Sequence, residues 1–196
     1  VGRRPRVLLG ATGSVATVKV PKLALALAEV ADVRVVVTEK AKTFLAKAEA
    51  YDAAAWATFQ ASGIEVLSDA DEWDAWQEIG DDVVHVELRK WADLLVIAPL
   101  SANSLAKLAN GLCDDLLSCT ARAWDFDKPF VVAPAMNTAM WTHPLTATHL
   151  ADLRVLGVAA VPPASKKLAC GDVGPGALAD VPAIVTAAGA ALGEAW

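Results

Sequence analysis

The chain has 196 residues, of which 55% are hydrophobic and 20% charged, and it carries a formal net charge of −6 at pH 7. This composition is too apolar for a disordered chain and predicts a single globular domain over residues 1–196 that makes a subunit contact. No Lys/Arg cluster exceeds two residues and no apolar run approaches the roughly 18 residues that span a bilayer, so we expect a cytoplasmic protein without nucleic-acid or membrane partners.

Short apolar runs alternate with Ala/Leu-rich segments along the whole chain. Strands are expected at residues 6–11, 33–38, 93–100, 129–135 and 155–162, and helices at residues 19–30, 101–111, 112–124 and 143–153. Continuous Val/Ile/Leu runs separated by helices are typical of a parallel sheet covered on both faces. The pattern predicts an α/β fold with a doubly wound parallel sheet, a flavodoxin/Rossmann-like three-layer sandwich. Ligands in such folds bind beyond the carboxyl ends of the strands.

The first two expected strands are followed by small and hydroxyl residues. Gly13, Ser14 and Val15 open a helix after the first strand, where free backbone N–H groups and a hydroxyl favour an anion, and Thr38 ends the second strand. The first turn matches neither the P-loop pattern nor G-x-G-x-x-G. Taken alone, it is more often a tight turn and a helix cap.

The third and fourth strands end in the same way. Residues 98–104 read "APLSANS" and residues 133–137 read "APAMN". Individually, Ser101 can be only a helix N-cap and Asn137 only a turn residue. Because four strands deliver such residues to one sheet edge, we predict a planar, phosphate-bearing cofactor there.

The three cysteines favour neither a disulfide framework nor a metal site. Cys113, Cys119 and Cys170 are odd in number, lack C-x-x-C spacing and have no clustered histidines nearby. Cys170 lies in "KKLACGDVGPG", a stretch too rich in glycine and proline for a core element. On composition alone it would be a cysteine of no consequence.

Four stretches together resemble a known family. They read "GSVA", "HVELRKWADLLVIAPLSANSLAKLANGLCDDLL", "PAMNTAMW" and "LACGD" followed by "GALAD", and the resemblance runs from about residue 6 to about residue 185. The chain is similar to the homo-oligomeric flavin-containing cysteine decarboxylases, and most similar to the stand-alone plant and animal forms that act on phosphopantothenoylcysteine. The long matches are specific, whereas "GSVA" is weak by itself.

The resemblance implies FMN-dependent decarboxylation of 4'-phosphopantothenoylcysteine to 4'-phosphopantetheine in coenzyme A biosynthesis. In this chemistry the flavin oxidises the substrate thiol, the resulting thioaldehyde accepts the electrons released with carbon dioxide, and an ene-thiol remains to be reduced. Cys170 matches the family's cysteine that donates the proton in this last step, on a loop that closes over the substrate.

Other site residues follow from the same resemblance. His85 is expected to be catalytic, either as the base that assists thiol oxidation or as a partner that orients the substrate, although a lone histidine among apolar residues is more commonly structural. His143 and His149 match nothing catalytic. The substrate-binding residues are expected to be Asn137, Met140, Lys167 and Ala169.

The family binds FMN and is typically trimeric, with the flavin at the subunit interface. A homotrimer is therefore expected, with Trp91, Trp124 and Trp141 suited to subunit contacts unless they are buried within one subunit. The expected FMN-binding residues are Gly13, Ser14, Val15, Thr38, Phe44, Ser101, Ala102, Asn103, Ser104 and Ala135.

Two other functions remain open on the sequence. One is a flavin-binding regulatory protein that inhibits a protein phosphatase, although the long acidic tail associated with that role is missing from "GAALGEAW". The other is a different flavoenzyme on the same fold, such as a flavin prenyltransferase or a peptidyl-cysteine decarboxylase. Neither is expected to combine His85, "PAMN" and the loop cysteine.

Overall fold

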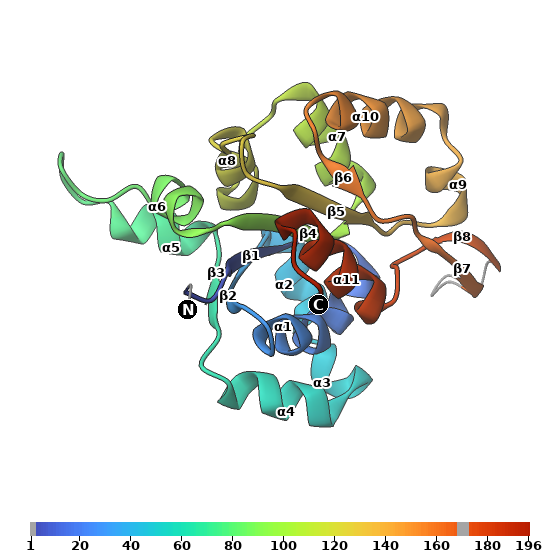
Figure 1. The fold of residues 1–196 in the computed structure, drawn as a ribbon, viewed down its shortest axis with the longest axis horizontal. Helices are drawn as coiled ribbons and strands as arrows, with labels where there is room; N and C mark the ends of the chain where they lie inside the picture. Colours follow the sequence, from blue (N-terminus) through green and yellow to red (C-terminus); the bar gives the residue numbers. More distant parts are fainter. Residues whose placement is uncertain (1–2, 168–172) are drawn as a thin grey trace.

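The computed structural model of the chain describes residues 3–167 and 173–196 (Figure 1). Its centre is a six-stranded sheet in the order β3-β2-β1-β4-β5-β6, and every pair of neighbouring strands is parallel. The strands are β1 (Arg6–Ala11), β2 (Asp32–Val37), β3 (Glu65–Leu67), β4 (Leu94–Leu100), β5 (Phe130–Pro134) and β6 (Ala159–Ala160). The predicted doubly wound parallel sheet is thus confirmed.

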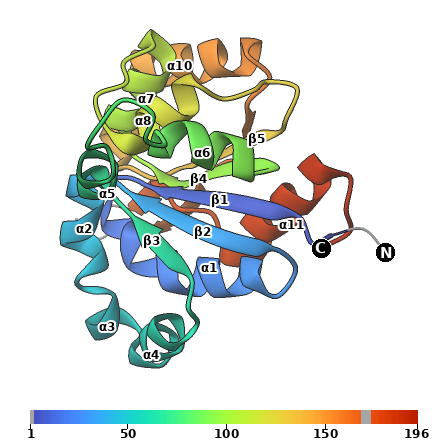
Figure 2. The ribbon, with the colours of Figure 1, turned by 90° about the vertical axis from the view of Figure 1, so that its left-hand side faces the viewer.

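Helices cover both faces of the sheet (Figures 1 and 2). One face carries α1 (Val20–Ala28), α3 (Ala48–Tyr51), α4 (Ala53–Ala61) and α11 (Val181–Leu192). The other carries α6 (Val84–Trp91), α7 (Ala102–Asn110), α8 (Leu116–Arg122) and α10 (Pro144–Val155). The 3-10 helix η1 (Val15–Lys19) follows β1, and α2 (Glu39–Leu45), α5 (Asp69–Ala75) and α9 (Thr138–Trp141) are short helices that follow β2, β3 and β5.

Two hydrophobic clusters hold the layers together. Side chains alternate across each strand, so Val7 and Leu9 of β1 belong to one cluster and Leu8 to the other. All seven residues of β4 are buried, which is the pattern expected of a central parallel strand with helices on both faces. The central strands are therefore packed on both faces, so residues at their carboxyl ends occupy fixed positions.

A small antiparallel hairpin lies outside the main sheet. It is formed by β7 (Ala164–Lys167) and β8 (Val173–Ala177), and Figure 1 places it next to α9. The two strands flank residues 168–172, which include Ala169 and Cys170 and are outside the described part of the chain.

The structure corrects three predicted features. The strand expected at residues 155–162 is limited to β6, because Val155 ends α10. The helix expected at residues 112–124 begins only at Leu116, because Asp115 caps it. Trp124 is 5% exposed and its ring packs edge-on against Phe130 of the same chain, so the prediction that it suits a subunit contact is wrong.

Trp91 and Trp141 keep part of their surface exposed. The Trp91 ring lies under the guanidinium group of Arg34, 4.5 Å from the ring centroid.

Over the described residues, no helix combines the length and apolarity that a bilayer crossing requires.

Candidate active site

A cavity of about 380 Å³ lies at the carboxyl edge of the sheet, where β1, β2 and β4 end. Its volume falls in the range of small-molecule and cofactor sites. Half of the ten predicted cofactor residues line it, namely Gly13, Thr38, Ser101, Asn103 and Ser104. The other lining residues are Glu39, Lys40, Asp69, Lys107, Asp114 and Asp115.

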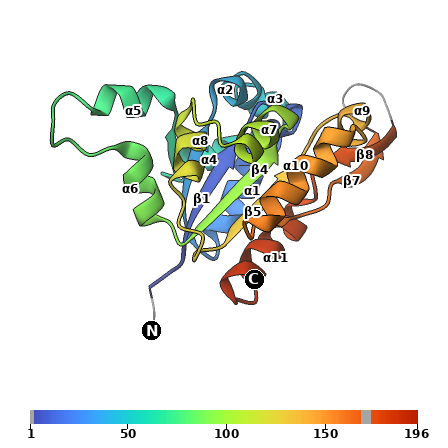
Figure 3. The same ribbon diagram turned by 90° about the horizontal axis from the view of Figure 1, so that it is seen from above.

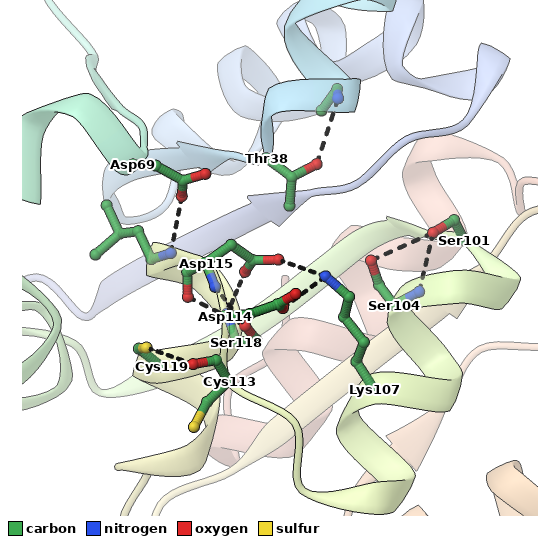
Figure 4. A network of polar contacts seen from close by, with 12 residues as sticks. Thr38, Asp69, Ser101, Ser104, Lys107, Cys113, Asp114, Asp115, Ser118 and Cys119 are labelled. Atoms are coloured by element: carbon green, nitrogen blue, oxygen red, sulfur yellow. Dashed lines mark hydrogen bonds and ion pairs between the residues drawn. The ribbon is translucent and has the colours of Figure 1, made fainter.

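Three hydroxyl groups cap the helices that begin at this edge. Ser14 accepts a hydrogen bond from the Ala16 N–H at 3.3 Å, and Thr38 accepts one from the Ala41 N–H at 3.3 Å. Ser101 accepts one from the Ser104 N–H at 3.2 Å (Figure 4). These residues are thus helix caps, as the sequence analysis allowed. A hydroxyl whose oxygen accepts a capping hydrogen bond can still donate its own hydrogen. The Ser14 and Thr38 hydroxyls can hold an anion or a ring oxygen without giving up their caps, whereas the Ser101 hydroxyl donates to the Ser104 hydroxyl oxygen at 3.3 Å.

Thr12 joins the turns that follow β1 and β4. Its side chain is fully buried, its hydroxyl donates to the Pro99 carbonyl at 2.8 Å, and the same oxygen accepts from the Ser101 N–H at 2.7 Å. A third bond runs from the Thr12 N–H to the Pro99 carbonyl at 3.1 Å. The two turns that carry most of the predicted cofactor residues are thus fixed to each other.

Gly13 lies where a side chain does not fit. A Cβ atom at this position would lie 2.7 Å from the Cβ of Lys40 in α2. The turn after β1 therefore packs closely against the start of α2 and leaves its own backbone open to the cavity. Of the remaining predicted cofactor residues, Val15 is half exposed, Phe44 is partly buried in α2, Ala102 lies in the first turn of α7, and Ala135 is buried just after β5.

The cavity contains charged residues that the sequence analysis missed. The Lys107 ammonium donates to Asp114 at 2.6 Å and to Asp115 at 3.4 Å (Figure 4). The hydrogen bond to Asp114 raises the pKa of Lys107 and lowers that of Asp114. Lys107 lies three residues after Ser104, on the same side of α7, and this spacing was the one signal that could have identified it.

Asp69 connects the cavity to the start of α8. Its carboxylate accepts the N–H of Leu116 at 2.8 Å, which ties the start of α5 to the start of α8 (Figure 4). Partial burial raises the pKa of Asp69. This residue also had no motif that pointed to it.

His85 lies in the first turn of α6, where its Nδ1 contacts the Oε1 atom of Glu72 on α5. The thiol of Cys119 is close by, since one ligand atom from each of Glu72, His85 and Cys119 lies within 4.8 Å of the others. Burial raises the pKa of the Cys119 thiol to about 11, whereas zinc binds the thiolate and usually needs a fourth ligand. We therefore infer no metal site here, and its absence stays a prediction.

Asn137 and Met140 lie in the α9 segment. The Asn137 side-chain oxygen accepts the N–H of Met140 at 2.8 Å and so caps α9, which leaves its amide N–H₂ group free to donate. Both side chains are exposed, Met140 by 47%. Strand β8 holds this segment, because the Met136 N–H donates to the Gly176 carbonyl at 2.9 Å and the Thr138 hydroxyl to the Pro175 carbonyl at 3.0 Å.

A single chain does not bring all predicted catalytic and substrate residues together. Figures 1 and 3 place α6, with His85, at one end of the long axis of the molecule, and α9 with the β7–β8 hairpin at the other. Lys167 ends β7 at the second end, whereas Ala169 and Cys170 lie outside the described residues. Five of the predicted cofactor residues lie around one cavity, but His85 and Asn137 do not lie together.

Comparison with known proteins gives a consistent picture. The family described as Flavoprotein matches residues 2–192. A protein from Oryza sativa named phosphopantothenoylcysteine decarboxylase is 52% identical over 90% of this chain and 76% of its own length. A mouse protein of the same name is 48% identical over 98% of this chain and 89% of its own length.

Two solved structures have the same fold and about half of the sequence in common. A PPC decarboxylase mutant complexed with pantothenoylaminoethenethiol is 50% identical, with a TM-score of 0.86 over 94% of this chain and 96% of its own. The FMN binding protein AtHal3 is 49% identical, with a TM-score of 0.82 over 94% of this chain and 95% of its own.

Proposed function

This chain belongs to the flavoprotein family and, within it, to the phosphopantothenoylcysteine decarboxylases, and from this premise we propose how its own residues carry out the reaction. The enzyme removes the carboxylate of 4'-phosphopantothenoylcysteine to give 4'-phosphopantetheine in coenzyme A biosynthesis, and it uses a flavin. Our proposal is that the flavin is FMN, that the site residues are those predicted from the sequence, and that the protein acts as a cytoplasmic homotrimer.

The cavity at the carboxyl edge of the sheet is the observation that carries this proposal. Thr38 and Ser101 line it from two strand ends, Ser14 caps the helix directly after Gly13, and the side-chain-free turn at Gly13 allows a ligand to approach the backbone. This donor set suits a phosphate and a polar ring edge. The similar FMN binding protein AtHal3 supports FMN as the flavin. When bound, FMN supplies the two-electron oxidation of the substrate thiol and later returns those electrons.

His85 acts as the base for the substrate thiol. An imidazole exchanges a proton near neutral pH, and the Nδ1 atom of His85 is already engaged by Glu72, so Nε2 is the nitrogen that accepts the thiol proton. The S–H bond breaks and an N–H bond forms. The electron pair of the S–H bond then forms the second bond of the thioaldehyde C=S group, while the neighbouring carbon loses a hydride that the bound flavin would accept.

Asn137 binds the substrate carboxylate through its amide N–H₂ group. Its oxygen is fixed as the cap of α9, so the direction of the amide is set before substrate arrives. Met140 packs against the substrate chain, and Lys167 and Ala169 contact it from the segment around β7. These four roles are carried over from the family motif, and the exposure of the Asn137 and Met140 side chains supports them.

Cys170 donates the proton, and the bound flavin would return the two electrons, that together convert the ene-thiol into product. The bond formed is C–H at the carbon that lost carbon dioxide, and the thiolate left on Cys170 is reprotonated from solvent. A PPC decarboxylase mutant has been solved with pantothenoylaminoethenethiol, an ene-thiol of this kind, which supports the ene-thiol as the species that waits for this proton.

Two chains of the homotrimer complete each site. His85 and Asn137 lie at opposite ends of one chain, so a site that uses both has to take them from neighbouring subunits. Trp73 and Ile79, on the segment between Glu72 and His85, are 76% and 96% exposed, and a subunit contact would cover them. The substrate is then held between subunits. A cytoplasmic setting agrees with the free thiols of Cys113 and Cys119.

Replacing Gly176 by alanine is expected to weaken substrate binding and leave flavin binding intact. Gly176 has a φ of +126°, and a Cβ there would lie 2.3 Å from the Met136 carbonyl oxygen, so β8 cannot keep its place beside Asn137. We expect KM to rise at least about tenfold, equivalent to the roughly 1–3 kcal/mol that such backbone strain costs. Steady-state kinetics and the flavin absorbance of the purified variant measure both effects.

Gly63→Ala is the matched control for Gly176→Ala. Gly63 also has a positive φ, +71°, but a Cβ there meets nothing within 4 Å. Its cost is limited to the conformational term of about 1–2 kcal/mol, so KM should stay close to that of the wild type. An unchanged KM in Gly176→Ala would show that the contact between β8 and Met136 plays no part in substrate binding.

The proposed function is tested by anaerobic incubation of the flavin-loaded protein with 4'-phosphopantothenoylcysteine, following flavin absorbance and product mass together. Transient bleaching that recovers, with release of carbon dioxide and no net oxidation, is the expected result. Persistent bleaching with an ene-thiol product would contradict the role of Cys170. A protein that binds no FMN and forms no product would contradict the proposal as a whole.

A further inference from the structure

We infer that Glu72 is a positioning residue for His85, one that holds the imidazole in the tautomer and orientation in which Nε2 accepts the substrate proton. This inference rests on the proposed role of His85 and adds a residue that no sequence motif indicated. Its basis is the direct contact between Glu72 Oε1 and His85 Nδ1, which joins α5 to α6 across 13 positions of the chain.

The contact determines which ring nitrogen carries the hydrogen. A carboxylate only accepts hydrogen bonds, so the Nδ1 atom of a neutral His85 has to donate to Glu72. The Nε2 atom is then left with its lone pair. In a histidine without this partner both tautomers are populated, and only one of them has an unprotonated Nε2 atom.

The contact between Glu72 and His85 is largely buried, which strengthens it and separates it from solvent. The side chains of Glu72 and His85 are only 12% and 27% exposed. The third group nearby, the Cys119 thiol, is neutral because burial and then the Glu72 charge raise its pKa to about 11, and it donates to the Cys113 carbonyl at 3.2 Å. Among these three groups, Glu72 is thus the one that supplies charge to the ring.

The position of Glu72 is itself fixed by its helix. Ser68 and Asp71 form a capping box at the start of α5, in which the Ser68 N–H and hydroxyl donate to the Asp71 carboxylate at 2.7 and 2.9 Å. One residue further on from the cap, Asp69 ties the same turn to α8. The carboxylate of Glu72 therefore meets His85 from a backbone that is anchored at two points.

The role of this arrangement in the reaction is electrostatic as well as geometric. When Nε2 takes the thiol proton, the ring becomes positively charged, and the Glu72 carboxylate lies directly against its Nδ1–H group. An interaction that strengthens as charge develops lowers the barrier and leaves binding of the neutral state almost unchanged. Loss of Glu72 should consequently lower kcat rather than raise KM.

Glu72→Gln tests the inference, because it keeps the size of the side chain and removes its charge. We expect kcat to fall by about tenfold to a hundredfold, the loss seen when the partner that orients a metal-bound histidine is removed, with KM and flavin content unchanged. Glu87→Gln is the matched control, since Glu87 lies on the same helix as His85 and pairs with Lys90 at the surface. That variant should keep wild-type kinetics.

A second readout separates positioning from folding. The chain has three histidines, so ¹⁵N-histidine labelling gives few signals, and His85→Asn identifies those of His85. Solid-state ¹⁵N NMR should show His85 with Nδ1 protonated and Nε2 unprotonated in the wild type, and a mixture of tautomers in Glu72→Ala, which has no acceptor for the Nδ1–H group. The signals of His143 and His149 should be the same in both proteins.

The outcomes distinguish this inference from the proposed role of His85. If His85→Asn is inactive while Glu72→Gln keeps a kcat within about twofold of the wild type, or Glu72→Ala keeps the His85 tautomer, the positioning role of Glu72 is overturned and the role of His85 stands. If His85→Asn is fully active, the proposed base is wrong and the positioning role falls with it.

Discussion

Cys170→Ser is expected to separate the loss of carbon dioxide from the formation of 4'-phosphopantetheine. A hydroxyl is a much weaker acid than a thiol, so the variant should oxidise and decarboxylate the substrate but fail to protonate the ene-thiol. Yield of 4'-phosphopantetheine should fall by about 10²–10⁴-fold, the usual contribution of a positioned acid. Product mass, carbon dioxide release and flavin absorbance, recorded on the same sample, measure the three steps.

The control for this experiment is Cys113→Ser, because Cys113 is an exposed free cysteine without a proposed role. It should behave as the wild type. In Cys170→Ser the flavin should stay bleached in the absence of oxygen, since its electrons have no protonated acceptor. A normal yield of 4'-phosphopantetheine would show that another group donates the proton.

Mixed oligomers of two inactive variants are expected to regain activity. His85→Asn alone should lose about 10²–10⁴-fold in kcat because it lacks the base, and Asn137→Ala should fail to bind the substrate carboxylate. If each site takes His85 from one chain and Asn137 from the next, every cyclic trimer that contains both variants keeps about one intact site in three.

The measurement is the activity of oligomers purified by two different affinity tags, compared with each variant alone. Oligomers of His85→Asn mixed with the double variant His85→Asn/Asn137→Ala are the control, since they cannot form an intact site. A mixed sample of the two single variants that stays inactive would contradict the two-chain site. The flavin content of each sample shows that loss of activity does not come from loss of the cofactor.

The central strands were predictable from the sequence because burial on both faces produces long apolar runs. β1 and β4 were predicted within one residue, and β2 was shifted by one. Apolar runs predict strands poorly at the edges of the sheet. β3 reads Glu65-Val66-Leu67 with two exposed residues and has no apolar run, whereas the apolar run at residues 155–162 predicted a much longer strand than β6, which has only two residues, both exposed.

The site was predictable where backbone and ligand set the residue type. Gly13 is required by the close approach of Lys40, and Thr38 and Ser101 are required as helix caps, so small and hydroxyl residues after a strand were informative. Pairs of residues that meet only because separate helices pack together leave no pattern in the sequence. Glu72 meets His85, and Asp69 meets Leu116, only because α5 docks beside α6 and α8.

Thr12 limits how this site can change in evolution or by design. The Thr12 hydroxyl donates to the Pro99 carbonyl and accepts from the Ser101 N–H. The turns after β1 and β4 therefore form one rigid unit rather than two independent loops. Lengthening either turn alone would break these bonds in the fully buried space around Thr12. To accept a different ligand at this edge, evolution or design would have to change both turns together, whereas the strands beneath them could stay as they are.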